Sequence, residues 1–242
     1  MLKSKTAIVL CSLAASLPAF AMSAARVVMP SNDVSIPASI REKLAQCEDV
    51  RAFTPLPSGD DVVVFDTVRD RPDSPDFMDN HPHLAFFHAG NVVFDLDAVD
   101  VAPVGPVRFH GLVLSPQPDK TVTLIAAFTL GVDSAETFFV FVGQNPKGYE
   151  TIATLSGGQA QLRFNENLQG HFELWAADGQ AAHKTENQCV WCRKYYEMTS
   201  YQFDGGKLRK LSTSTSKQAY EPEPFFEKPF ALSSEKPRAE TR

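Results

Sequence analysis

The feature that most constrains the fold is a long succession of short runs rich in β-branched and aromatic residues, separated by Gly, Pro, Asn and Asp. The runs have the residue types that favour strands, and the separators are the residues that turns require. Many strands joined by small turns predict a mainly β fold, built as an antiparallel sandwich, a barrel or a partial propeller. The expected strands are 62–65, 84–87, 92–94, 107–114, 122–130, 137–142, 149–155, 160–164, 171–175, 194–203 and 208–211.

Two glycine-containing turns fix the connections in the second half of the chain. The clearest is Asp204-Gly205-Gly206, because glycine accepts the positive φ that tight hairpin turns need. A second turn is expected at Ser156-Gly157-Gly158. Both indicate antiparallel neighbours.

One short N-terminal helix precedes the β region. Pro37 suits the first helical position. Ile40, Leu44 and Cys47 follow at i, i+4 and i+7, which places them on one face of a helix. We therefore expect Cys47 to point toward the core.

The first 21 residues have the pattern of a signal peptide. Lys3 and Lys5 precede an apolar stretch over 6–17, and 19–21 form a small-x-small cleavage site. The apolar stretch is too short to remain as a membrane span. Export to the periplasm or the cell exterior is the expectation, with the mature chain starting at Met22. An uncleaved anchor, or a lipoprotein acylated at Cys11, is the alternative.

The rest of the chain divides by composition. Residues 22–34 lack periodicity and are expected to form a lead-in, and 35–216 to form the β-rich domain, with a division into two subdomains near residue 145 left open. Residues 217–242 are rich in Glu, Lys, Pro and Ser, which predicts a disordered tail. The aromatic residues within 222–230 are an exception, since they could also dock on a partner or on the protein's own body.

The charge balance narrows the class of partner. The chain has 23 Lys and Arg against 29 Asp and Glu, a net charge of −6, and loss of a signal peptide containing Lys3 and Lys5 would make it more acidic. A chain with net negative charge is disfavoured as a nucleic-acid-binding protein, because it repels the phosphate backbone. No segment after the signal is apolar and long enough to span a membrane.

Three cysteines remain after signal cleavage, namely Cys47, Cys189 and Cys192. Disulfides persist in exported proteins, so one structural bond is expected, either between Cys47 and one of the other two or within the Cys-x-x-Cys pair. A redox-catalytic role is less favoured, because Cys192 leads into an expected strand and not into a helix N-terminus that would lower its pKa.

A candidate metal site lies at Asp79, His81 and His83. Imidazole and carboxylate groups bind zinc, and three protein ligands leave a fourth position for an activated water. His88 or His110 from neighbouring strands could complete the set. The simpler alternative is a polar surface loop with a partly buried histidine.

A resemblance is found in the C-terminal half, over roughly residues 148–211. Gly170-His171-Phe172-Glu173-Leu174-Trp175 followed by Tyr201-Gln202-Phe203-Asp204-Gly205-Gly206-Lys207-Leu208 resembles a pattern in uncharacterised exported bacterial β-rich proteins. In that pattern a Gly-x-x-Asp-Leu strand precedes a Tyr-x-Phe-Asp-Gly hairpin, and here Glu173 replaces the usual Asp. The resemblance implies β architecture and export, and no activity.

Two classes of function follow from these features. The first is an exported, non-catalytic binding protein without a cofactor, such as an inhibitor, an immunity-type protein or an envelope interaction module. It would bind a protein of the cell envelope or exterior through a β face or a loop. The alternative is a zinc-dependent hydrolase using Asp79, His81 and His83. The polar residues form no complete catalytic set in the sequence, which favours the first class.

Overall fold

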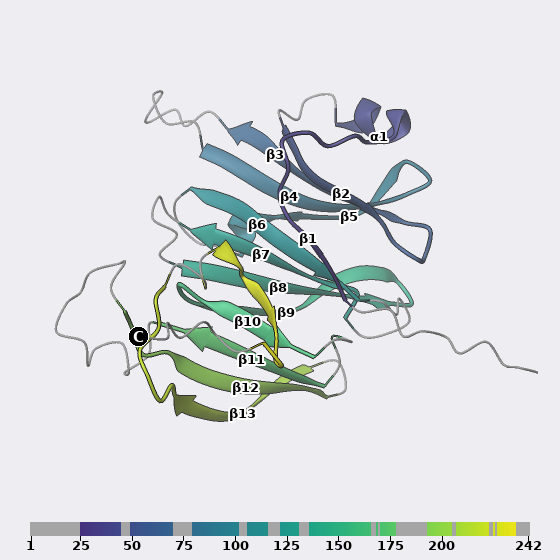
Figure 1. Cartoon of the computed structure of the whole chain (residues 1–242). Coiled ribbons are helices and arrows are strands. Elements are labelled where there is room, and N and C mark those ends of the chain that lie inside the picture. The colour runs from purple at the N-terminus through teal and green to yellow at the C-terminus, as the bar shows by residue number, and fades with distance from the viewer. Residues whose placement is uncertain are drawn as a thin grey trace, which may run out of the picture.

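The computed structural model of the protein is a sandwich of three β-sheets, which confirms the mainly β, antiparallel architecture (Figure 1). Apart from β1, which belongs to the middle sheet, the layers lie in the order of the chain, with the helix on the outside of the first sheet. The structure describes residues 25–44, 49–69, 79–101, 106–115, 122–130, 136–165, 168, 170–177, 193–204, 207–222, 225 and 227–235.

The first sheet is antiparallel and has the order β2-β3-β4-β5. Its strands are β2 (Asp49–Pro55), β3 (Asp61–Arg69), β4 (Asp79–His88) and β5 (Asn91–Asp97), followed by the 3₁₀ turn η1 (Ala98–Asp100). Its outer face packs against α1 (Ala38–Lys43), because Ile40 and Leu44 are buried on Phe65 and Phe87. The short helix is therefore confirmed, while Cys47 lies outside the described residues.

The middle sheet has the order β1-β6-β7-β8-β9. Its strands are β1 (Arg26–Val28), β6 (Val107–Leu114), β7 (Leu124–Leu130), β8 (Glu136–Asn145) and β9 (Gly148–Gly158). Successive side chains of a strand point to opposite faces. Ala126 accordingly packs against the first sheet and Ala127 against the last, both fully buried. Burial on both faces explains why β7 and β8 are continuously apolar.

The last sheet has the order β13-β12-β11-β10-β14. Its strands are β10 (Gln161–Phe164), β11 (His171–Ala176), β12 (Glu197–Asp204), β13 (Lys207–Thr215) and β14 (Phe230–Leu232). The β14 strand is parallel to β10, and the other pairs are antiparallel. Asp204 pairs with Lys207, which confirms the predicted two-residue hairpin.

One expected turn is wrong, and the structure has a hairpin at the place where a division into two subdomains was left open. The Ser156-Gly157-Gly158 segment is not a turn but the end of β9, where Gly158 pairs with Glu136, and the chain turns afterwards at Gln159 with φ 43°. The position near residue 145 is not a division between subdomains. It is the end of a β8–β9 hairpin within the middle sheet, so strand pairing continues on both sides of it.

Both ends of the described chain differ from the expectation. The lead-in contains β1, which pairs with β6. The expected disordered tail contains β14, and Phe225 and Phe230 are only 2% and 6% exposed. Burial of these aromatic side chains in the body offsets the polar composition around them. Residues 1–24, 236–242, Cys189 and Cys192 lie outside the described residues, so the signal peptide and the disulfide stay predictions.

Candidate functional site

The residues of the predicted metal site lie on the outer face of the first sheet, beyond the part that α1 covers. His83 is opposite Phe65 on β3 and opposite Asp97 on β5, and His81 lies two residues earlier on the same face of β4. Both imidazoles face Asp97, with His81 Nδ1 and His83 Nε2 each 3.9 Å from a carboxylate oxygen. Asp79 begins β4 opposite Arg69, and its side chain lies outside the described part.

His83 is held by a second carboxylate and by an aromatic ring. Its Nδ1 lies 3.1 Å from Asp95 Oδ1, and its ring stacks on Phe65 with centroids 5.1 Å apart. The hydrogen bond to Asp95 raises the pKa of His83; burial opposes this, while the charges of Asp95, Asp97 and Asp100 add to it. Protonated His83 is therefore favoured between two acidic side chains.

The side chain of Asp79 lies outside the described residues, so the expected zinc site at Asp79, His81 and His83 stays a prediction. Among the described residues, no group of three or more His, Cys, Asp or Glu side chains is placed to hold a metal. His88 and His110 do not join it, because His88 contacts Asp60 and His110 lies on β6 of the middle sheet. What the structure brings together is two imidazoles facing Asp95 and Asp97, a pairing of opposite charges when the histidines are protonated.

A second polar cluster, which sequence reasoning missed, centres on the buried carboxylate of Asp60. Its Oδ1 lies 2.6 Å from His88 Nδ1, and its Oδ2 accepts hydrogen bonds from the hydroxyls of Ser58, at 3.0 Å, and Tyr149. Burial raises the pKa of Asp60, but the bonds from Tyr149, His88 and Ser58 outweigh it and hold that pKa below 3.8. His88 and Tyr149 are 28 and 89 positions from Asp60 in the sequence, so no local motif could have revealed the cluster.

The Asp60 cluster connects two layers of the sandwich. Asp60 precedes β3 of the first sheet, and Tyr149 lies near the start of β9 in the middle sheet. Burial and the hydrogen bond to Asp60 raise the pKa of Tyr149 to about 12. The Tyr149 ring also packs on Phe86, with centroids 4.1 Å apart. These contacts point to a structural role, since each carboxylate oxygen already has a donor.

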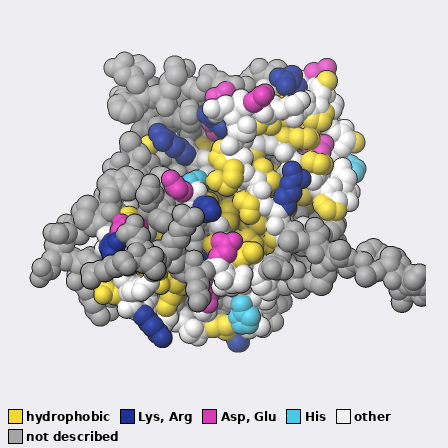
Figure 2. Space-filling view, viewed as in Figure 1, with side chains coloured by type: hydrophobic (Ala, Val, Ile, Leu, Met, Phe, Trp, Pro, Cys, Tyr) yellow, Lys and Arg dark blue, Asp and Glu magenta, His cyan; other side chains and the backbone are white. Residues whose placement is uncertain are grey.

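A row of hollows follows β1 and the segment after it, and we call this row the β1 groove. It consists of three hollows of about 410, 250 and 340 Å³. The first and second hollows share the lining residue Met29, and the second and third share Arg51, so neighbouring hollows meet at a common residue. Figure 2 shows this face, where hydrophobic side chains form a broad area bordered by charged ones.

The first hollow of the β1 groove lies between β1 and the segment that contains β14. Its apolar lining is Val27, Met29, Pro229 and Phe230. Val27 and Met29 are 47% and 45% exposed, although both are large apolar residues. Val28 between them packs into the core, as the alternation of side chains along a strand requires.

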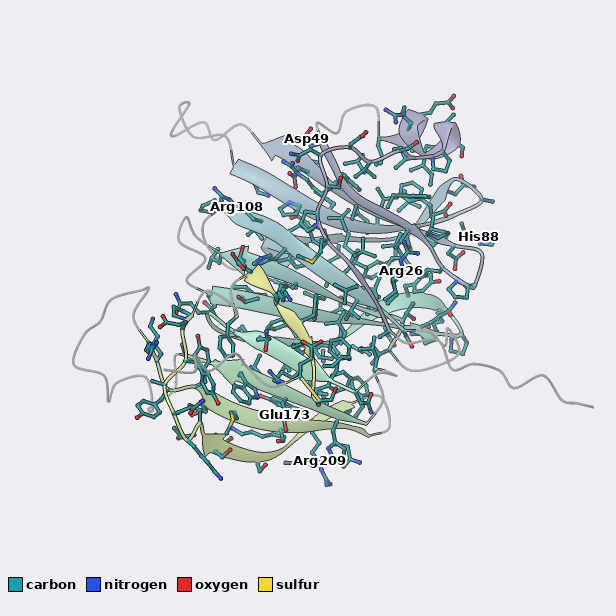
Figure 3. All side chains as sticks on the ribbon, in the orientation of Figure 1. Arg26, Asp49, His88, Arg108, Glu173 and Arg209 are labelled. Carbon is teal, nitrogen blue, oxygen red and sulfur yellow. The ribbon has the colours of Figure 1, made fainter. Side chains whose placement is uncertain are left out.

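The two ends of the β1 groove differ in charge. Glu227, Lys228 and Glu235 line the first hollow, and Arg51, Asp66 and Arg108 line the third. Arg51 is already paired, with Nε 2.7 Å from Asp66 and Nη2 3.2 Å from Asp49. Arg108 is exposed near the start of β6 (Figure 3) and pairs with no other described side chain.

Comparison of the chain with protein-family models, with curated proteins and with solved structures found no match. The resemblance over residues 148–211 therefore stays a prediction. No helix among the described residues is both long and apolar enough to cross a membrane.

Proposed function

We propose that the protein is an exported, non-catalytic binding protein that holds a protein partner in the β1 groove. The observation that carries this proposal is the coincidence of a row of adjacent hollows, an edge strand and two exposed apolar side chains, Val27 and Met29. Exposed apolar area bordered by polar residues is typical of interaction sites. An edge strand has unpaired backbone groups that a partner can use.

The polar clusters support binding over catalysis. The three hollows of the β1 groove are lined by neither His81, His83 nor Asp60. Asp60 already accepts hydrogen bonds on both carboxylate oxygens. The His83 ring is hydrogen-bonded to Asp95 and stacked on Phe65. A reaction needs its acid, base or nucleophile within reach of a bound substrate.

The location of the partner follows from the predicted signal peptide. An exported protein meets proteins of the envelope or the cell exterior, so an inhibitor, immunity-type or envelope interaction role fits the groove. The predicted disulfide among Cys47, Cys189 and Cys192 would suit the same compartment. None of these roles requires a cofactor.

Site-specific photo-crosslinking tests the proposal. A photoreactive residue replaces Met29 in one variant and Val93 in a control, because the control position is also apolar, 46% exposed and located on β5, away from β1. We expect a crosslinked protein from the exported fraction at position 29 only. Its loss in a Val27→Lys background would locate the contact to the β1 groove. Identical adducts at positions 29 and 93, or none at 29, would contradict the proposal.

A further inference from the structure

We propose that the occupant of the β1 groove is an extended polypeptide segment that pairs antiparallel with β1. Its side chains are apolar at alternate positions. It has an acidic residue toward its N-terminal end and a basic residue toward its C-terminal end. This inference rests on the proposed function and adds the chemistry of the partner. It follows from the strand edges, the side-chain pattern and the charges of the groove.

Two strand edges border the first hollow. The β1 strand is the edge of the middle sheet, and β14 is the edge of the last sheet. Leu162 N–H donates to Pro229 O, and Ser233 N–H donates to Phe164 O, at 2.8 Å each. In this parallel register the main-chain groups of Phe230 point away from β10. Such edges are used for strand addition, in which main-chain hydrogen bonds hold an extended peptide.

The lining of the groove favours apolar side chains at alternate positions. Val27 and Met29 project from one face of the β1 segment, so a strand beside it would place every second side chain against them. Met29 and Phe230 pack closely over Gly111 of β6 because this residue has no side chain. A Cβ at Gly111 would be 3.3 Å from Met29 Sδ and 3.9 Å from Phe230 Cε2. The hollow of about 410 Å³ is within the size range of ligand pockets.

The charges give the occupant a direction. The first hollow has Glu227 and Glu235 against one Lys228, which favours a basic side chain. Arg108 in the third hollow, which pairs with no other described side chain, favours an acidic one. Arg26, on β1, projects from the opposite face to Val27, because adjacent side chains of a strand alternate. Complementary charges at an interface fix register and orientation more than affinity.

The antiparallel order follows from the direction of β1. The chain runs from Val27 beside the first hollow to Pro30 beside the third. A strand antiparallel to it begins near Arg108 and ends near Glu227 and Glu235. Antiparallel pairs are also about two to three times as frequent as parallel ones. We therefore predict a segment that begins with an acidic residue, continues with apolar residues at alternate positions and ends with a basic residue.

Selection from two displayed peptide libraries of equal composition tests this order. One library has the form Asp-(X)6-Lys and the other Lys-(X)6-Asp, where X is any residue. Both are selected on the full chain, and enriched peptides are synthesised and measured by fluorescence anisotropy. We expect enrichment of the Asp-first library with apolar residues at alternate X positions, and at least about tenfold weaker binding to Val27→Lys and Met29→Glu. Val93→Lys is the matched control and should bind as the wild type does.

A charge-swap variant provides the decisive comparison. Arg108→Glu combined with Glu227→Lys and Glu235→Lys should make the chain bind peptides of the Lys-first library about tenfold more tightly than those of the Asp-first library. Each exposed ion pair changes the binding constant by a small factor, and the factors of the three substitutions multiply. Retention of the Asp-first preference, selected peptides without alternation, or no enrichment over the Val27→Lys variant would each overturn the inference. If crosslinking at position 29 still captured a partner, only this chemistry would fail and the proposed function would stand.

Discussion

The hydrogen bond from Tyr149 to the buried carboxylate of Asp60 gives a quantitative test of how the first and middle sheets are held together. Tyr149→Phe removes the hydroxyl and leaves the ring against Phe86. Asp60 is 7% exposed, so water replaces the lost donor poorly. A hydrogen bond to a charged group contributes about 1.5–3 kcal/mol, and we expect the free energy of unfolding to fall by that amount at neutral pH.

Tyr196→Phe is the matched control for this substitution. The Tyr196 side chain is fully buried, and its hydroxyl has no hydrogen-bond partner among the described residues. Its ring stacks on Phe225 with centroids 4.0 Å apart, which phenylalanine preserves. Removing an unsatisfied buried hydroxyl should leave stability unchanged or raise it by about 1 kcal/mol. The same chemical change is thus expected to lower stability at Tyr149 and not to lower it at Tyr196.

Urea unfolding of the two variants and the wild type, followed by fluorescence, measures both effects. The pH dependence provides a further check. The folded-state pKa of Asp60 is lowered, so its contribution is present above the ordinary value of 3.8 and is lost as the pH falls through the folded pKa. The difference between wild type and Tyr149→Phe should therefore shrink below pH 4. Equal destabilisation by both substitutions, or a difference that grows on acidification, would refute the reasoning.

Two further predictions concern the outer face of the first sheet and the C-terminal segment. His83→Gln should destabilise the protein most below pH 6.5, and the effect should decline as the pH rises through the raised folded pKa, which unfolding curves between pH 5 and 8 would measure; an effect that increases with pH would contradict this. Phe230→Ala should cost about 3 kcal/mol, because this side chain is 6% exposed and packs against Phe139 and Phe164. Unchanged stability would show that the segment is the disordered tail that the composition suggested.

The interior of the sandwich could be predicted only in part. Residue types and turn signals located the strands, but not how many layers they form, because an apolar run such as Leu124–Leu130 has no alternation from which a face can be assigned. Burial of Ala126 and Ala127 in different clusters settles that question. The β2 strand was missed because its sequence around Arg51 is mixed, and a bulge between Val50 and Ala52 disturbs its register.

The surface proposed for binding was unpredictable for a different reason: it is built from the two parts of the chain that composition assigned to a lead-in and a tail. Strands of three residues, such as β1 and β14, are too short for periodicity, and they form because existing sheets offer a place to pair. Within the described part of the chain no strand pairs with their outer edges, and Val27 is exposed. A groove between such strands is consequently both the least predictable part of the fold and the part with most capacity to accept another strand. If the charge-swap variant reverses the preferred peptide direction, the groove accepts an extended strand in the predicted orientation; if it does not, the exposed edge needs another explanation.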